Sequence, residues 1–228
     1  MCARTTLTRK RLRDVADELE AEFSEEDAKL YRPRYNAAPS ETLWMLRAGA
    51  AGAASADNRA LVPATWGYLA GGRALINVRG EQVGSGRGFR EAFASRRCGV
   101  VCDGFFEWDR RHRPTWFHRS DGGLIVLGSL YQRPADAGHL PRFTILTTRP
   151  NRLVAAVHDR MPLILPPERL DGWLSDEPAR VLDLLAPAPE AGWLATPVST
   201  RVNRVRHDDP ECLVPVEPAA QDRQCELF

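Results

Sequence analysis

The stretch RRCGVVCDGFFEW, residues 96–108, contains two short apolar runs, CGVVC at 98–102 and FFEW at 105–108. Runs of this length and composition predict β-strands. Cys98 and Cys102 fit this apolar setting as small buried side chains. These two strands are the centre from which the rest of the fold is predicted.

Similar apolar runs on both sides of this stretch predict the remaining strands. On the N-terminal side, residues 42–47 and 59–69 form an expected hairpin whose small-residue tip, residues 48–58, we expect to be mobile, and residues 74–79 form a short strand. On the C-terminal side, the expected strands are residues 115–118, 124–130, 143–148, 161–165 and 195–200.

Helical patterns fall between these strands without regular alternation. The longest is residues 8–22, for which Thr8 is the expected N-cap. The others are residues 89–95, 151–157, 168–174 and 177–185, and residues 31–39 are expected to be irregular. The sequence therefore predicts a single α+β domain with a mixed or antiparallel, barrel-like sheet and flanking helices.

Composition narrows the class of protein. The 228 residues are 43% hydrophobic and 27% charged, with a formal net charge of +1, which is typical of a globular domain. The sequence contains no apolar run long enough to span a membrane and no secretory signal, so we expect a cytoplasmic protein. Five cysteines without a CxxC pair argue against a disulfide framework and against a structural metal site.

Cys2 is the first candidate for chemistry. Removal of Met1 would leave a thiol and an α-amine on adjacent carbons, and both have a nucleophilic fraction near neutral pH. Such a 1,2-aminothiol condenses with an aldehyde to an imine, and the thiol then closes a thiazolidine ring. Position alone also fits the alternative that Cys2 is simply a small second residue.

Four further positions carry candidate groups. Glu107 lies among aromatic residues, where an apolar setting would raise its pKa and make it a general acid, or it is an exposed strand residue. His158 is either a proton shuttle or a structural residue bonded to a carbonyl or to Asp159. Asn77 and Arg79 alternate along one strand and so share a face, which suits a sugar-phosphate or is a polar outer face. Thr147 either positions a hydroxyl or serves strand propensity.

Several motifs occur together in one order, and this order resembles that of the SRAP family, the SOS response-associated peptidases or abasic-site processing proteins. The motifs are MCAR at the start, YNAAPS at 35–40, NVRGE at 77–81, RRCGVVCDGFFEW at 96–108, TILTT at 144–148, HDRMP at 158–162 and VNRVRHDDPECLVP at 202–215. The resemblance implies one domain over residues 2–215, followed by a flexible tail over residues 216–228.

The resemblance also implies roles for individual residues. Cys2 would attack the ring-opened aldehyde of an abasic site in single-stranded DNA, Glu107 and His158 would transfer protons, Asn77 would hold the sugar, and Thr147 would support the site. The implied DNA contacts are Arg4, Asn36, Arg79 and Trp66, the last as a stacking platform. Ala3, Val78 and GYLAGG at 67–72 depart from the family pattern, which affects the shape of the groove and not its reactive groups.

The tail ends in QCELF, residues 224–228. Gln224, Leu227 and Phe228 match a peptide pattern common in ligands of the bacterial sliding clamp, and a terminal position on a linker suits that role. Three matched positions also arise by chance. We expect a monomer associated with the nucleoid and replication, with single-stranded DNA as its partner, and without cofactor, metal or membrane contact.

Two other functions are consistent with the same residues. One is an N-terminal-nucleophile hydrolase, in which Cys2 attacks an amide and the α-amine serves as base. The other is a non-catalytic single-strand binder, which would need Arg79 and Trp66 but neither Cys2 nor Glu107. Formation of a Cys2-dependent covalent adduct with an abasic oligonucleotide distinguishes the crosslinking enzyme from both.

Overall fold

The computed structural model describes residues 3–49, 59–83, 88–134, 136 and 138–217. Cys2, the greater part of the expected hairpin tip, and Gln224, Leu227 and Phe228 of the tail lie outside the described residues. No helix among the described residues is long and apolar enough to cross a bilayer.

The larger of the two main sheets closes on itself. Its central strands are β4 (Thr42–Ala48), β5 (Arg59–Trp66), β9 (Arg97–Cys102), β12 (Ile125–Gln132) and β13 (Arg142–Thr148). Pairing runs from β13 through β12, β9 and β4 to β5, and β5 pairs again with β13 in parallel. This closed circuit confirms the expected α+β fold with a mixed, barrel-like sheet.

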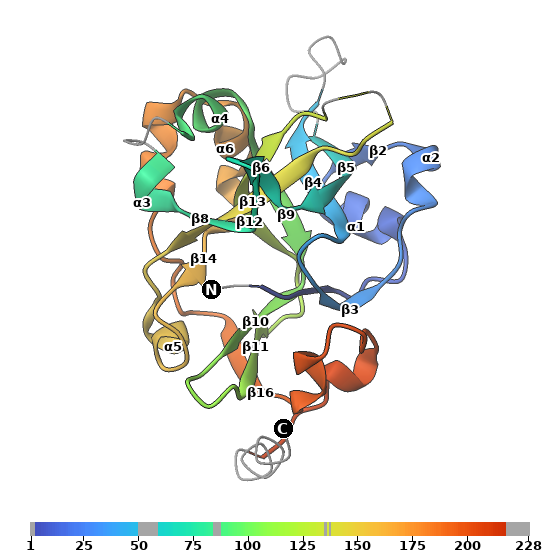
Figure 1. Cartoon of the computed structure of the whole chain (residues 1–228), viewed down its shortest axis with the longest axis vertical. Helices are drawn as coiled ribbons and strands as arrows, with labels where there is room; N and C mark the ends of the chain where they lie inside the picture. The colour runs from blue at the N-terminus through green and yellow to red at the C-terminus, as the bar shows by residue number, and fades with distance from the viewer. Residues whose placement is uncertain (1–2, 50–58, 84–87, 135, 137, 218–228) are drawn as a thin grey trace.

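Short strands extend the large sheet, and a second sheet lies against it (Figure 1). The extensions are β2 (Ala21–Phe23), β8 (Asn77–Arg79), β14 (Met161–Pro162) and β15 (Ile164–Leu165). The second sheet has the order β16 (Trp193–Pro197), β11 (Pro114–Arg119), β10 (Gly104–Trp108), β1 (Thr5–Leu7) and β3 (Arg34–Ala37). A small separate hairpin joins β6 (Tyr68–Ala70) to β7 (Arg73–Leu75).

Helices flank the large sheet on two sides, with α3, α4 and α6 on one side and α1 and α2 on the other (Figure 1). Their bounds are α1 (Leu12–Glu18), α2 (Glu25–Ala28), α3 (Gly80–Val83), α4 (Arg90–Ser95), α5 (Arg152–Ala155) and α6 (Leu170–Ser175). Four 3₁₀ helices complete the described chain: η1 (Pro167–Arg169), η2 (Pro178–Leu184), η3 (Thr200–Asn203) and η4 (Pro210–Leu213).

The central strands are covered on both faces, which explains why CGVVC at 98–102 is apolar without interruption. Cys98, Val100 and Cys102 belong to a cluster of side chains with Met45 and Phe143. Val101 points the other way, into a cluster that includes residues of α1, α4 and α6. Cys98 and Cys102 are both fully buried, as the sequence predicts.

The N-terminal region differs from the single helix expected over residues 8–22. The helix begins only at Leu12 and ends at Glu18, and Glu20 has a positive φ of 50°, which the helix cannot continue through. The chain then enters β2, which pairs in parallel with β5. Thr8 is not an N-cap, because its backbone N–H and its hydroxyl both donate to Asp103.

Three other local expectations need correction. Residues 5–7 form β1, which the sequence pattern did not reveal, and residues 34–37 of the expected irregular segment form β3. β1 and β3 are strands because they pair with each other, and β1 also pairs with β10. The helix expected over residues 177–185 is the 3₁₀ helix η2.

Candidate functional site

Glu107 is a buried carboxyl near the end of β10. Its side chain is 1% exposed, and its neighbour Phe105 on the same strand face packs with Val154 and Met161. Desolvation by burial raises the pKa of Glu107 to about 7, and the negative charge of Asp159 acts in the same direction. Glu107 is therefore a carboxyl in an apolar setting and not an exposed strand residue. At neutral pH the carboxyl is present in both protonation states, as a general acid requires.

His158 lies in the loop that follows α5. Asn151 caps this helix by accepting a hydrogen bond from the backbone N–H of Val154 at 3.0 Å, and the N–H of His158 donates to the carbonyl of Val154 at 2.9 Å. The imidazole Nδ1 accepts from the backbone N–H of Arg160 at 3.0 Å. Nδ1 also lies 3.3 Å from the carbonyl oxygen of Arg160, so the contacts around the ring are compatible with either neutral tautomer.

The protonation of His158 follows from its surroundings. Burial lowers the pKa of His158, and the nearby carboxylate of Asp159, 3.2 Å from Nδ1, acts against this shift. The imidazole is therefore mainly neutral at pH 7 and presents an N–H donor.

Asn77, Arg79 and Thr147 are brought together by parallel pairing of β8 with β13. Thr147 lies opposite Arg79, and Ile145 opposite Asn77. Asn77 is half-buried, Arg79 is exposed, and Val78 between them is buried, as expected if Asn77 and Arg79 share the outer face. Thr147 is fully buried.

Arg160 connects the His158 loop to these strands, and the sequence analysis did not single it out. Its Nη2 donates to the carbonyl of Thr147 at 2.6 Å and contacts the hydroxyl of Thr147 at 3.3 Å. Its Nη1 and Nη2 donate to the two carboxylate oxygens of Glu81, both at 2.8 Å, and this pairing lowers the pKa of Glu81. Arg160 stands in the HDRMP motif and Glu81 in the NVRGE motif, and these motifs are the sequence signal that could have identified the pair.

A groove of about 790 Å³ is lined by His158 and by none of the other candidate residues that the structure describes. One wall is the turn between β10 and β11, with Trp108, Arg110 and Arg111, and the other is the end of α5 with residues 155–159. Asp109 holds the turn by accepting from the backbone N–H groups of Arg111 and Arg113, at 2.9 and 3.0 Å, and by pairing with the Arg113 guanidinium. The groove therefore carries several guanidinium groups next to His158.

Trp66 does not provide the expected stacking platform. Its ring is fully buried, lies against Phe143 with a centroid separation of 6.1 Å, and donates from Nε1 to the carbonyl of Ile76 at 2.9 Å. No face of the ring is open to a base. Trp66 is buried because it is the last residue of β5, at the point where β5 pairs with β13, and its side chain therefore belongs to the core of the closed sheet.

Asn36 is also not on a DNA-facing rim. It is fully buried, and its Nδ2 donates to the carbonyls of Val202, Arg204 and His207 at 3.0, 3.2 and 2.8 Å. Asn36 therefore holds the segment around η3 against β3. Arg4 is half-buried, with its guanidinium 5.9 Å from the centroid of the Trp108 ring, and burial lowers its pKa.

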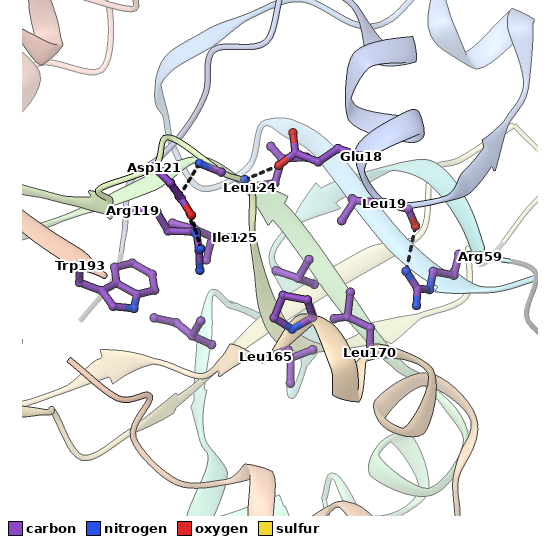
Figure 2. Close-up of a pocket in the computed structure, with 14 residues that line it drawn as sticks. Glu18, Leu19, Arg59, Arg119, Asp121, Leu124, Ile125, Leu165, Leu170 and Trp193 are labelled. Atoms are coloured by element: carbon purple, nitrogen blue, oxygen red, sulfur yellow. Dashed lines mark hydrogen bonds and ion pairs between the residues drawn. The ribbon is translucent and has the colours of Figure 1, made fainter. Parts of the chain in front are cut away.

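None of these residues lines a second cavity, of about 270 Å³. Figure 2 shows the side chains that line it. Leu165, Leu170 and Trp193 contribute apolar surface to it. The polar groups around it are engaged with each other: Arg119 pairs with Asp121, and Arg59 donates to the carbonyl of Leu19 at 3.0 Å. Nothing in this cavity resembles a reactive centre.

A model of the SOS response associated peptidase (SRAP) family matches residues 1–205. The chain belongs to the SRAP family. The SRAP match contains every described candidate residue and ends before the tail.

Individual relatives of this SRAP chain are moderately similar. The abasic site processing protein YoqW of Bacillus subtilis (strain 168) is 30% identical over 200 residues, which cover 80% of this chain and 86% of that protein. The abasic site processing protein YedK of Escherichia coli (strain K12) is 29% identical over 196 residues, which cover 80% and 85%. A crystal structure of a protein from Bacteroides thetaiotaomicron has the same fold, with a TM-score of 0.78 at 19% identity, covering 95% of this chain and all of that one.

Proposed function

We propose that this chain processes abasic sites in single-stranded DNA and that Cys2, after removal of Met1, forms a covalent thiazolidine link to the opened sugar. The observation that supports this most directly is the position of Glu107. The backbone N–H of Phe106 donates to the carbonyl of Arg4 at 3.1 Å, so the start of the chain runs along β10 next to a carboxyl whose pKa is about 7. One peptide bond, with Cα atoms about 3.8 Å apart, joins Ala3 to Cys2.

Formation of the imine between Cys2 and the aldehyde needs a proton donor next to the reacting carbon. The α-amine of Cys2 adds to the aldehyde carbon, and the first amine proton passes to the aldehyde oxygen by way of Glu107, which gives a hydroxyl. Protonated Glu107 then donates a proton to this hydroxyl, which leaves as water, and the second amine proton returns to Glu107, which gives an imine. The thiol then adds to the imine carbon, its proton passes to the nitrogen, and the ring closes. Glu107 in its ionised form accepts the proton that the amine loses in the first addition, so one group with a pKa near 7 serves both steps.

The remaining site residues have roles that follow from where they lie. Asn77 presents an amide beside the exposed guanidinium of Arg79, which suits a hydroxyl and a neighbouring phosphate. His158 lines the groove and supplies an imidazole for later proton transfers that reverse the link or cleave the strand. The groove with Arg110 and Arg111 supplies positive charge for the phosphate backbone.

The decisive experiment is covalent capture. Incubation with a single-stranded oligonucleotide that contains one abasic site is expected to give a heat-stable adduct. Its intact mass is expected to equal the chain without Met1 plus the oligonucleotide, less one water. Cys2→Ser removes the thiol and is expected to abolish this thiazolidine product, and its persistence in the variant would refute the mechanism.

A peptidase that uses the same Cys2 is the second candidate, and the name of the matched family favours it. In that mechanism the thiol attacks an amide carbon and the α-amine serves as base. Turnover of an unrelated peptide that is lost in Cys2→Ser would support it. A chain that forms the DNA adduct and cleaves no peptide would leave abasic-site processing as the activity.

We also propose that the tail binds the sliding clamp through Gln224, Leu227 and Phe228, which would associate the chain with replication at the nucleoid. The support is the sequence QCELF at 224–228 alone. Deletion of residues 224–228 is expected to abolish clamp pull-down while DNA capture continues. Undiminished pull-down by the deleted chain would end this proposal.

A further inference from the structure

Asp103 is the one residue between β9 and β10, and its carboxylate is almost completely buried, at 6% exposure. Its Oδ1 accepts from the hydroxyl of Thr6, and its Oδ2 accepts from the backbone N–H and from the hydroxyl of Thr8, all at 2.6 Å. The backbone N–H of Asp103 donates to the carbonyl of Thr6 at 2.8 Å. All four bonds therefore join Asp103 to the end of β1.

β1 by itself is weakly held in its register. It has three residues, and its paired positions on β10 are Thr5 with Phe105 and Thr6 with Gly104. On its other side it pairs with β3, and there the register shifts between Thr5 and Leu7. A slip by one residue would turn every side chain to the opposite face, and a slip by two would move the strand by about 7 Å.

Such a slip would separate the start of the chain from Glu107. Transfer of a proton needs heavy atoms within about 3 Å, or one intervening water. In the observed register the carbonyl of Arg4 accepts from Phe106, so Ala3 comes next in the direction of Glu107. The register of β1 thus decides whether Cys2 can reach the carboxyl.

The hydroxyl of Thr6 is held from a second side. Trp116 on β11 donates from Nε1 to Thr6 Oγ1 at 3.3 Å. Trp116 reaches it by crossing Gly104 so closely that an added Cβ at Gly104 would lie 2.1 Å from Nε1. Because the hydroxyl accepts from Trp116, its own proton is directed to Asp103.

We propose that Asp103 is a positioning residue for the crosslinking reaction, and this rests on the proposed function because it requires Cys2 as the nucleophile. Asp103 holds Thr6 and Thr8, which fixes β1 in register on β10 and keeps the first residues of the chain beside Glu107. If β1 moved in either direction, Thr6 and Thr8 would no longer donate to the buried carboxylate of Asp103. Because loss of these bonds is costly, they favour the observed register of β1 on β10.

The test compares two substitutions at Thr6. Thr6→Val keeps the shape of the side chain and removes the hydrogen bond to Asp103, and Thr6→Ser keeps the bond. Single-turnover adduct formation with excess protein gives the maximal rate. Binding of an oligonucleotide with a tetrahydrofuran residue, which has no aldehyde, gives the affinity separately. We expect Thr6→Val to lower the maximal rate by about 10-fold with little change in affinity, because small misplacements of reacting groups are costly. Thr6→Ser is expected to keep the wild-type rate.

Asp103→Asn provides an independent second variant. In either orientation of the amide, its nitrogen replaces one accepting oxygen of Asp103, so the bond from Thr6 or the two bonds from Thr8 are lost, and the negative charge that strengthens the remaining bonds is removed. We therefore expect a larger loss of maximal rate, about 100-fold. Arg97→Met is the matched control, because it removes a buried hydrogen-bonding side chain that donates to the carbonyls of Phe93 and Trp173, at the opposite end of β9. All rates are measured well below the melting temperature of the least stable variant.

The outcomes separate the two proposals. If the wild-type chain forms no Cys2-dependent adduct, the proposed function fails and the role of Asp103 fails with it. If wild type forms the adduct and both Thr6→Val and Asp103→Asn match its maximal rate, only the positioning role is overturned. A rate loss in Arg97→Met equal to that in Thr6→Val, or a loss of affinity alone, would also overturn it.

Discussion

At the scale of single residues, the site depends on groups whose protonation is set by burial. Glu107 is surrounded by protein, so its charged form is disfavoured and its pKa rises to about 7. His158 is buried enough for its pKa to fall below the usual value. One group is therefore an acid and the other a neutral donor at the same pH, a difference that suits stepwise proton transfer.

Replacing Glu107 by Gln tests the acid directly. Glu107→Gln keeps the shape and hydrogen-bonding capacity of the side chain but transfers no proton, so the maximal rate of adduct formation is expected to fall by about 100-fold. The rate is measured by gel-resolved single turnover across a range of pH. A variant that keeps both the wild-type rate and its pH profile would remove Glu107 from the mechanism.

Glu107 also predicts how stability depends on pH. Its pKa is raised from 4.5 to about 7 in the folded chain, so its contribution is complete below pH 4.5 and is lost as the pH rises through 7. Relative to Glu107→Gln, the free energy of unfolding of wild type is expected to fall by roughly 3 kcal/mol across this window. Urea unfolding at several pH values measures it, and parallel curves for the two proteins would contradict the assignment.

His158 predicts an effect on the later steps. His158→Gln retains an N–H donor but cannot transfer a proton, so reversal of the crosslink or strand cleavage is expected to slow by about 100-fold. Purified adduct is incubated with an excess of competitor oligonucleotide, and the released strand is followed with time. Unchanged release would assign His158 a structural role through its bond from Arg160.

At the scale of elements, β1 and β3 connect the ends of the described chain to the sheet that carries Glu107. β1 is attached to β10 through Asp103, and β3 is attached to the segment around η3 through Asn36 and Asp208. Asp208 accepts from the backbone N–H groups of Tyr35 and Asn36, at 2.6 and 2.8 Å, and from Arg34. Short strands that pair over few positions are held here by side chains.

Asn36 therefore predicts a stability effect rather than a DNA-binding effect. Asn36→Ala leaves one buried and two partly buried carbonyls without their donor, which is expected to destabilise the fold by about 2 kcal/mol. Such a loss lowers the melting temperature by about 4–8 °C in a protein of this size. Thermal unfolding measures it. A loss of DNA affinity with unchanged melting temperature would restore the rim position that the sequence resemblance implied.

At the scale of the whole molecule, the net charge of +1 conceals a local concentration of guanidinium groups. The groove beside His158 contains Arg110, Arg111 and Arg113, of which Arg113 is paired with Asp109. Asp109 and Asp159 also line the groove. For the proposed function, the guanidinium groups suit the phosphates of a single strand that passes over the groove, since phosphate contacts provide most of the affinity for nucleic acids.

The groove predicts a salt dependence. Replacing both Arg110 and Arg111 with Ser is expected to weaken binding of the tetrahydrofuran oligonucleotide. It is also expected to reduce the slope of log K against log salt by about 1.4, at roughly 0.7 for each single-strand phosphate contact. Arg169→Ser is the control, because Arg169 pairs with Asp183 and does not line the groove. Equal slopes for the doubly substituted chain and wild type would place the DNA elsewhere.

The sequence by itself determined the order of the main strands, the α+β class and the reactive residue types. Apolar runs such as residues 98–102 and 143–148 indicate strands that are buried. In the closed sheet these strands are covered on both faces, so their side chains are apolar on both faces. Motifs and their neighbours singled out five candidate site residues: Glu107, His158, Asn77, Arg79 and Thr147. The negative charge of Asp159, in the loop of His158, raises the pKa of Glu107. Arg160 of the same loop donates a hydrogen bond to the carbonyl of Thr147.

The tertiary structure alone decided which polar groups serve the site and which hold the fold. Asn36 stands in the YNAAPS motif and Trp66 was assigned by the family resemblance, but the burial of Trp66 depends on β13 and the bonds of Asn36 go to carbonyls 166 or more residues away. β1 exists because β10 and Asp103 bind it, and Arg160 matters because Glu81 and Thr147 lie within its reach. A pattern along the chain reports which side chains are buried, whereas the partner of a buried polar group is set by contacts between distant segments.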